Sequence, residues 1–332
     1  MIGLLLATGF GDPQTLGRVA LDEVSGIAVG VHGTYVQEDS GNGPLVERVD
    51  ATGRVVATLR LPVRNRDWED LAAAPDAAGV PSLWVADTGD NRAVRDEVQV
   101  LRCAEPSGTR VGPVTTYRFT YDDGPHDAEA LLVLPGGTRV AVVTKGVAGE
   151  AVYAAALDAT SPQVLHRVAD VPVRLTGTAG GPVGSFSQLL VTGGSVAPDG
   201  RTLVLRTYTD LYEWDLTADL AATFGKDPVV SPLPPTHQGE AVGYARDGRS
   251  VLVAGEGEGS PLQRLTRTAR PTRTARPTPT ALPTPTTAPG ARPATRDRSA
   301  SRRILLEVAG IAVVVGLSGF VRTRPSRRRR PG

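Results

Sequence analysis

The chain has 332 residues, an ordinary hydrophobic share of 40% and a net charge of +1 that conceals two oppositely charged parts. Residues 264–332 hold 16 arginines against two acidic residues, a net charge of +14, and the remaining 20 basic and 33 acidic residues give −13. Phosphates would repel the acidic part, which argues against nucleic acid as its partner, and the single cysteine, Cys103, excludes an intramolecular disulfide.

Residues 1–14 begin with an apolar stretch, Met1 to Phe10, that lacks the basic start of a signal peptide. Two explanations are open for it. One is the remnant of a signal peptide whose start codon lies further upstream, and the other is a merely apolar N-terminus. We favour the first, because the other end of the chain indicates export.

Residues 15–265 consist of short runs rich in Val, Leu and Thr that Gly, Pro and Asp interrupt, which predicts an all-β domain. Five units share one register, in which a polar residue stands seven positions before the first turn. These residues are Ser25, Glu69, Glu129, Thr192 and Glu240. Units of about 40 to 60 residues with three or four strands each predict a five-bladed β-propeller.

Two points about the propeller stay open at this stage. The long connection from Asp170 to Val191 leaves room for a degenerate sixth blade, and an irregular β-sandwich is the alternative fold. The last unit lacks an outer strand, which the segment Leu16 to Leu21 is expected to supply from the N-terminus. Such closure would leave no unpaired blade edge.

The C-terminal part changes composition abruptly. Residues 266–303 are rich in Pro, Thr and Arg, which predicts a disordered stalk. Residues 304–321 are apolar except for Glu307 and predict one transmembrane helix, with a buried or interfacial helix as the alternative. The basic residues 322–332 predict a cytoplasmic tail, which places the propeller outside the cell on a single-pass membrane protein.

The matched acidic positions suggest a site in the central channel of the propeller. Because the first strand of each blade lines this channel, Glu69, Glu129 and Glu240 are expected to converge as candidate metal ligands. The loop Asp87-Thr88-Gly89-Asp90-Asn91 adds Asp87, Asp90 and Asn91, since short oxygen-bearing side chains around a glycine suit Ca²⁺. Solvated turns and braces between neighbouring blades are the alternatives.

Other residues are candidates for the chemistry and the lining of the channel. His126 and His237 each stand three residues before a matched glutamate, which suggests an acid and a base. We also expect four further residues to line the channel, namely Ser25, Asp39, Asp70 and Lys145. Lys145 would balance the carboxylates or contact an anionic ligand.

At these residues the chain resembles exported bacterial β-propeller proteins of unassigned activity from high-GC genomes, similar to phytase esterase-like and gluconolactonase-type propellers. The motifs that carry this resemblance are Asp67-Trp68-Glu69-Asp70-Leu71, Ala86-Asp87-Thr88-Gly89-Asp90-Asn91, Asp127-Ala128-Glu129 and Gln238-Gly239-Glu240. It spans residues 20 to 265 and implies the propeller fold. Where relatives carry Asn-Asp-Ser-Gly-Asp, this chain has Glu38-Asp39-Ser40-Gly41-Asn42.

Two functions fit these observations. The first is a monomeric, membrane-anchored, cell-surface propeller that binds a small molecule or a cell-surface protein. The alternative is a Ca²⁺-dependent hydrolase of phosphoesters or lactones that uses the acidic channel. The absence of a Gly-x-Ser-x-Gly motif, a phosphate-binding loop and a Cys-x-x-Cys pair favours the first.

Overall fold

The structure is a computed structural model, and it describes residues 9–146 and 149–268. The predictions for residues 1–8 and 269–332 lie outside the described residues. They comprise most of the signal-peptide remnant predicted at residues 1–14, nearly all of the stalk, the transmembrane helix and the basic tail. Of the remnant, residues 9–14 are described, and Phe10 forms an antiparallel bridge with Arg267. Within the described part of the chain, no helix is long and apolar enough to cross a membrane.

The described residues form an all-β, propeller-like unit of five four-stranded antiparallel sheets, which we call blades 1 to 5. Blade 1 contains β2 (Val24–Val29), β3 (Thr34–Glu38), β4 (Leu45–Val49) and β5 (Val55–Arg60). Blade 2 contains β6 (Trp68–Pro75), β7 (Pro81–Asp87), β8 (Val98–Ala104) and β9 (Val114–Tyr121). Blade 3 contains β10 (Ala128–Val133), β11 (Arg139–Thr144), β12 (Ala151–Ala156) and β13 (Gln163–Asp170).

Blade 4 contains β14 (Val191–Val196), β15 (Thr202–Thr207), β16 (Asp210–Asp215) and β17 (Val229–Pro232). Blade 5 contains β18 (Gly239–Tyr244), β19 (Ser250–Gly255), β20 (Ser260–Thr266) and, from the other end of the chain, β1 (Gln14–Val19). Strand β1 pairs with β20 in antiparallel register. The expected closure by an N-terminal strand is therefore present, and it ties the two ends of the domain together.

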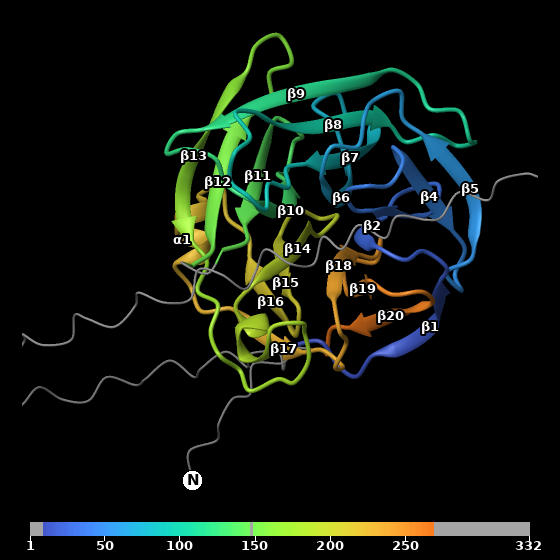
Figure 1. Ribbon diagram of the computed structural model, residues 1–332, viewed down its shortest axis with the longest axis vertical. Helices are drawn as coiled ribbons and strands as arrows, with labels where there is room; N and C mark the ends of the chain where they lie inside the picture. The colour runs from blue at the N-terminus through green and yellow to red at the C-terminus, as the bar shows by residue number, and fades with distance from the viewer. Residues whose placement is uncertain (1–8, 147–148, 269–332) are drawn as a thin grey trace, which may run out of the picture. The chain divides into compact units, whose positions relative to one another are not determined.

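The first strands of the blades, β2, β6, β10, β14 and β18, follow one another around the centre of the domain (Figure 1). Each contacts the next, and β18 contacts β2, so that these inner strands form a ring. The outer strands of blades 2 and 3 add an unpredicted link. β9 and β13 pair in parallel, which joins the two blades into one eight-stranded sheet.

The connection between β13 and β14 holds no sixth blade. It is described throughout, and it contains a loop and one short 3₁₀ helix, η1 (Gly184–Gln188). Its glycines explain the difference, because Gly177, Gly180 and Gly181 adopt positive φ angles that suit a winding loop rather than strands.

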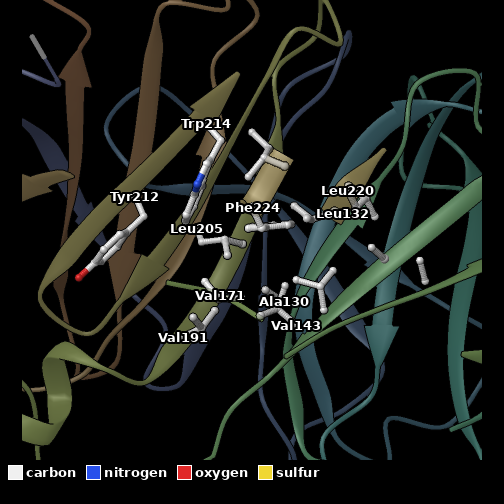
Figure 2. Packing of buried hydrophobic residues seen from close by; sticks show 14 of the residues in the cluster. Ala130, Leu132, Val143, Val171, Val191, Leu205, Tyr212, Trp214, Leu220 and Phe224 are labelled. Atoms are coloured by element: carbon white, nitrogen blue, oxygen red, sulfur yellow. The ribbon is translucent and has the colours of Figure 1, made fainter. Parts of the chain in front are cut away.

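The hydrophobic core is divided among the interfaces between neighbouring blades. Five buried clusters each combine apolar residues of two adjacent blades. Figure 2 shows the cluster between blades 3 and 4, where Leu132 and Val143 face Leu205 and Trp214. The helix α1 (Leu220–Phe224) adds Phe224 to this cluster.

Burial separates the inner strands from the outer ones. All six residues of the inner strands β10 and β18 and of the second strand β19 are buried, whereas β5 alternates between buried and exposed residues and β13 has a single buried residue. Each buried Leu, Val or Phe side chain contributes about 1.5 to 3 kcal/mol. The blade interfaces therefore supply the stability that allows polar residues to collect at the centre.

Candidate functional site

The five matched polar residues occupy equivalent positions in the structure. Each is the second residue of the inner strand of its blade. The five residues are Ser25, Glu69, Glu129, Thr192 and Glu240. In every blade the pairing between the first two strands shifts register at this residue. A β-bulge of this kind leaves the extra residue out of the ladder and redirects its side chain.

The two uncharged members of this set connect neighbouring blades. The hydroxyl of Ser25 donates to the carbonyl oxygen of Glu69, and that of Thr192 donates to the carbonyl oxygens of Gly239 and Glu240 at 2.9 and 3.2 Å. Bracing between blades, the structural alternative for the matched positions, thus describes these two residues.

Two of the three acidic members, Glu69 and Glu129, belong to a cluster of carboxylates, and the third, Glu240, lies outside it. The cluster lies where the inner strands begin, at the end of their ring that we call the mouth of the channel. One group consists of Asp39, Asp67 and Glu69, and a second consists of Glu69, Asp127 and Glu129. Within each group, one carboxylate oxygen per residue lies within 4.8 Å of the others. We call these five residues the acidic cluster, and Glu69 belongs to both groups.

The acidic cluster has a closed side and an open side. Glu69 and Glu129 are each only 3% exposed, whereas Asp39, Asp67 and Asp127 are half-buried. Both Asp-x-Glu pairs, 67/69 and 127/129, begin just before an inner strand, and the two-residue period of an extended chain turns both side chains to one face. The aspartates therefore lie nearer the solvent.

Asn65 holds Asp39 beside the start of blade 2. Its side-chain amide donates to the carbonyl oxygen of Asp39 at 3.1 Å, and its side-chain oxygen accepts from the backbone N–H of Trp68 at 3.1 Å. A loop that follows β3 in blade 1 is thereby fixed to the residues that open β6. This link brings Asp39, predicted to line the channel, into the acidic cluster.

The loop of residues 87–91 supports the acidic cluster from blade 2. Asp87 forms an ion pair with Arg95 at 3.0 Å, and Asp90 accepts two bonds of 2.6 Å from the backbone N–H groups of Val94 and Arg95. Asn91 is exposed. These three residues lie outside both carboxylate groups, and their assignment as metal ligands stays a prediction.

Gly89 is the residue of this loop that approaches the acidic cluster. A Cβ atom at this position would lie 1.9 Å from Oε1 of Glu69 and 2.6 Å from Cγ of Asp67. The backbone N–H of Asp90 also donates to Oδ1 of Asp127 at 2.7 Å. The glycine in the Asp-x-Gly-Asp motif therefore allows close packing of the loop against the carboxylates.

Burial and mutual repulsion disfavour the ionised forms of the acidic cluster. Burial is the main cause that raises the pKa of each of its five carboxyl groups. It raises the pKa of Asp39 to about 7, and the charges of Asp67 and Glu240 add to this shift. Nearby carboxylates, Glu129 first, further raise the pKa of Glu69. At neutral pH such a cluster retains protons unless a cation neutralises it.

Lys145 supplies a positive charge beside the acidic cluster. Its Nζ lies 2.8 Å from Oε1 of Glu129 and 5.2 Å from the ring centroid of Tyr208. Burial lowers the pKa of Lys145, but the surrounding carboxylates, Glu129 first, outweigh burial and hold it well above the usual range. Lys145 is therefore charged, as the prediction that it balances the carboxylates requires.

The mouth of the channel is built from one kind of connection. The loops between the second and third strands of the five blades bring in Asp39, Gly89, Lys145, Tyr208 and Glu256 in turn. Glu256 accepts a bond of 2.5 Å from the side-chain amide of Gln238, and burial raises its pKa to about 8. The same loop position thus contributes to the site in every blade.

Glu240 and Glu150 present unused carboxylate oxygens beside the acidic cluster. Glu240 is 4% exposed, and its charge acts on Glu129, Lys145 and Asp39. Its Oε2 is buried without a partner among the described residues. Oε2 of Glu150 is likewise buried and unpartnered in the described part, and burial raises the pKa of this group to about 8.

Asp70 lies next to Glu69 and has a structural environment. It is fully buried, and its carboxylate accepts hydrogen bonds from the backbone N–H groups of Leu71, Leu131 and Gly194 at 2.8, 2.8 and 3.1 Å. These donors belong to the inner strands of blades 2, 3 and 4. Asp70 therefore fastens three blades together at the centre.

His126 and His237, the predicted acid and base, both lie outside the two groups of carboxylate residues found in the described part of the chain. Nε2 of His126 lies 2.7 Å from Oδ1 of Asp123 and 2.9 Å from the hydroxyl of Tyr153, and its ring packs edge-on against Tyr121. His237 is exposed. Their roles as acid and base stay predictions.

Sequence reasoning missed Asp67 and Asp127 as site residues, although the signal was present. The histidines that stand three residues before a glutamate, His126 and His237, were recognised as a repeat. The aspartates that stand two residues before Glu69 and Glu129 form a repeat of the same kind, and it was overlooked. Tyr208 and Glu150 were missed as well. No repeated motif marks either of them, because each follows from loop geometry.

The donor set of the acidic cluster fits a hard divalent cation. Every ligand in the two groups is a carboxylate oxygen, which Ca²⁺ prefers, whereas Zn²⁺ and related metals favour histidine and cysteine. The shared residue Glu69 and the open side formed by the aspartates would leave room for water or a ligand on the cation.

Comparison with known proteins found similarity to solved structures only, at low sequence identity. No family model matches the chain, and no curated protein sequence matches it. A gluconolactonase from Xanthomonas campestris is 16% identical, with 79% of this chain and 92% of that chain covered and a TM-score of 0.44.

Two aldose sugar dehydrogenases are similar to the same extent. The enzyme from Streptomyces coelicolor, in its PQQ-bound form, is 13% identical over 77% of this chain and 98% of its own, with a TM-score of 0.44. The soluble enzyme from Escherichia coli, in its apo form, is 13% identical over 77% and 99%, again with a TM-score of 0.44.

Proposed function

We propose that the chain is a β-propeller binding module whose channel mouth holds a divalent cation, with Ca²⁺ as the best candidate. The observation that carries the proposal is the pair of carboxylate groups that share Glu69. Among the described residues, Lys145 forms an ion pair with Glu129 alone, so the five buried or half-buried carboxyl groups either keep protons or carry an unfavourable excess of negative charge. A bound cation offsets this excess.

The cation would hold a ligand at the open side of the acidic cluster. Asp39, Asp67 and Asp127 face this side, so a small molecule that approaches the mouth meets them before the buried glutamates. The binding role includes the anchor that the C-terminal sequence predicts. In this proposal residues 304–321 span the membrane, and the propeller lies on the outer surface of the cell.

Calorimetric titration of the full-length chain with Ca²⁺ tests the cation site. We expect binding to the wild type and its loss in Glu69→Gln, because Glu69 belongs to both groups. Glu258→Gln is the matched control, since Glu258 is an exposed residue of a mouth loop. At 100 times the dissociation constant, Ca²⁺ should add about 2.7 kcal/mol to the free energy of unfolding. Absence of binding heat and of any chelator effect on the melting temperature would refute the site.

Hydrolysis of phosphoesters or lactones is the second candidate function. It is favoured by Asp39, which lies on the open side of the acidic cluster with a pKa of about 7, in the range that suits a general base. In this scheme Asp39 accepts a proton from water, Lys145 holds Glu129 in place, and a bound cation would polarise the substrate oxygen.

A substrate panel separates the two functions. Turnover of a chromogenic phosphoester or a lactone by the wild type with Ca²⁺, lost in Asp39→Asn even at a Ca²⁺ concentration that saturates this variant, would support hydrolysis. Ca²⁺ binding without turnover of any member would support the binding module. Protease treatment of intact cells tests the location, and a propeller that stays uncut would contradict surface display.

A further inference from the structure

The two carboxylate groups that share Glu69 differ in their cationic partners. In the group of Asp39, Asp67 and Glu69, Asp39 accepts from the backbone N–H of Ser40, and the hydroxyl of Ser40 bonds to Asp67. In the group of Glu69, Asp127 and Glu129, an oxygen of Glu129 is taken by the ammonium group of Lys145 at 2.8 Å. One group is therefore available to a cation, and the other already contains one.

The environment of Lys145 has the features of a cation site. Its ammonium group lies against Glu129 and over the ring of Tyr208, and the charges of Glu240 and Glu69 also act on it. A carboxylate and an aromatic face together stabilise a desolvated cation. The ammonium group of Lys145 thus lies where carboxylates would otherwise surround a bound cation.

Glu240 provides independent evidence that this position is incompletely satisfied. Its Oε2 is buried without a hydrogen-bond partner among the described residues, and its side chain is 4% exposed. The same carboxylate acts electrostatically on both Glu129 and Lys145. A buried carboxylate oxygen with no donor is costly, and a divalent cation would satisfy it.

We infer that the channel contains two adjacent positions for divalent cations, and that Lys145 occupies the second and restricts the wild type to one bound ion. The first position is formed by Asp39, Asp67 and Glu69, and the second by Glu69, Asp127 and Glu129, with the buried oxygen of Glu240 as a further candidate ligand. This inference rests on the proposed function. Lys145 acts as a specificity-determining residue that sets the number of ions.

The test counts bound Ca²⁺ in the full-length chain and in Lys145→Met. We expect one equivalent in the wild type and two in Lys145→Met, because removing the ammonium group frees an oxygen of Glu129 and takes away a repelling charge. The first equivalent should also bind at least about tenfold more tightly. Lys145→Arg, which keeps the charge, should bind one.

The only other lysine of the chain provides the control. Lys226 is exposed beyond α1, and Lys226→Met should bind one equivalent with unchanged affinity. If Lys145→Met needs Ca²⁺ to fold, it is purified with Ca²⁺ and its metal content is measured by elemental analysis after gel filtration.

The outcomes separate this inference from the proposed function. One equivalent of unchanged affinity in both the wild type and Lys145→Met, or two equivalents in the wild type, would overturn the inference and leave the cation site standing. No binding to either protein would overturn the proposed function and the inference together.

Discussion

Replacement of Asp70 by alanine tests whether the centre of the domain is held by one buried carboxylate. The change removes the acceptor for three backbone N–H groups, those of Leu71, Leu131 and Gly194, and leaves them buried. Each buried donor without a partner costs roughly 1 to 3 kcal/mol, so for three donors we expect a loss of about 3 to 9 kcal/mol in the free energy of unfolding. Such a loss is a large share of the stability of a typical domain.

Asp70→Asn should have a smaller effect than Asp70→Ala. Its amide oxygen can take the place of Oδ2, which accepts from Leu131 and Gly194, while its NH₂ group faces the N–H of Leu71. One bond is lost, at about 1 to 3 kcal/mol. Chemical denaturation of the full-length variants measures both losses, with Asp96→Ala as the exposed control. A loss for Asp70→Ala within about 1 kcal/mol of the control would refute the reasoning.

Three further predictions concern the mouth of the channel. Burial raises the pKa of Glu150 to about 8, so the contribution of this group to stability is present below the pKa it has in the unfolded chain and is lost as the pH rises through 8. With a chelator present, the protein should therefore melt at a lower temperature at about pH 9 than at about pH 5. A higher melting temperature at about pH 9 would contradict this. Gly89→Ala should weaken Ca²⁺ binding at least about tenfold in calorimetry, since its Cβ would lie 1.9 Å from a carboxylate oxygen of the acidic cluster, whereas Gly108→Ala, with nothing within 4 Å, should not. Asn65→Ala should lower the free energy of unfolding by about 1 to 3 kcal/mol and weaken Ca²⁺ binding, because it releases the loop that carries Asp39; a stability loss with unchanged binding would show that the loop is held otherwise.

The repeat register made the all-β, propeller-like fold predictable from the sequence. Ser25 and Thr192 carry hydroxyl groups and Glu69 a carboxylate, yet their common distance to a turn placed all of them at the second position of an inner strand. Closure by β1 was predictable because the last unit of the repeat lacked an outer strand. The parallel pairing of β9 with β13 was not predictable, because it depends on how two blade edges meet in space.

The site was predictable only in part, for a physical reason. A strand position identifies which side chains face the channel, and this gave Glu69 and Glu129. The remaining members depend on loops whose course is fixed by contacts between blades, such as the hold of Asn65 on Asp39. In the loop of residues 87–91 the sequence pointed to the polar side chains. These bond to Arg95 and to backbone N–H groups nearby, and it is Gly89 that approaches the acidic cluster.

The β-bulge connects the fold to the proposed chemistry. At the bulge, the backbone of Glu69 or Glu129 is released from the ladder, so the side chain can turn to the channel without breaking the pairing of the rest of the strand. Collecting these carboxylates in a buried place destabilises the domain, and the five apolar blade interfaces offset that cost. A cation that binds the acidic cluster recovers part of the destabilisation. Cation affinity and the stability of the cation-free domain should therefore change in opposite directions, so a neutral replacement of Glu69 should stabilise the cation-free protein while it abolishes binding.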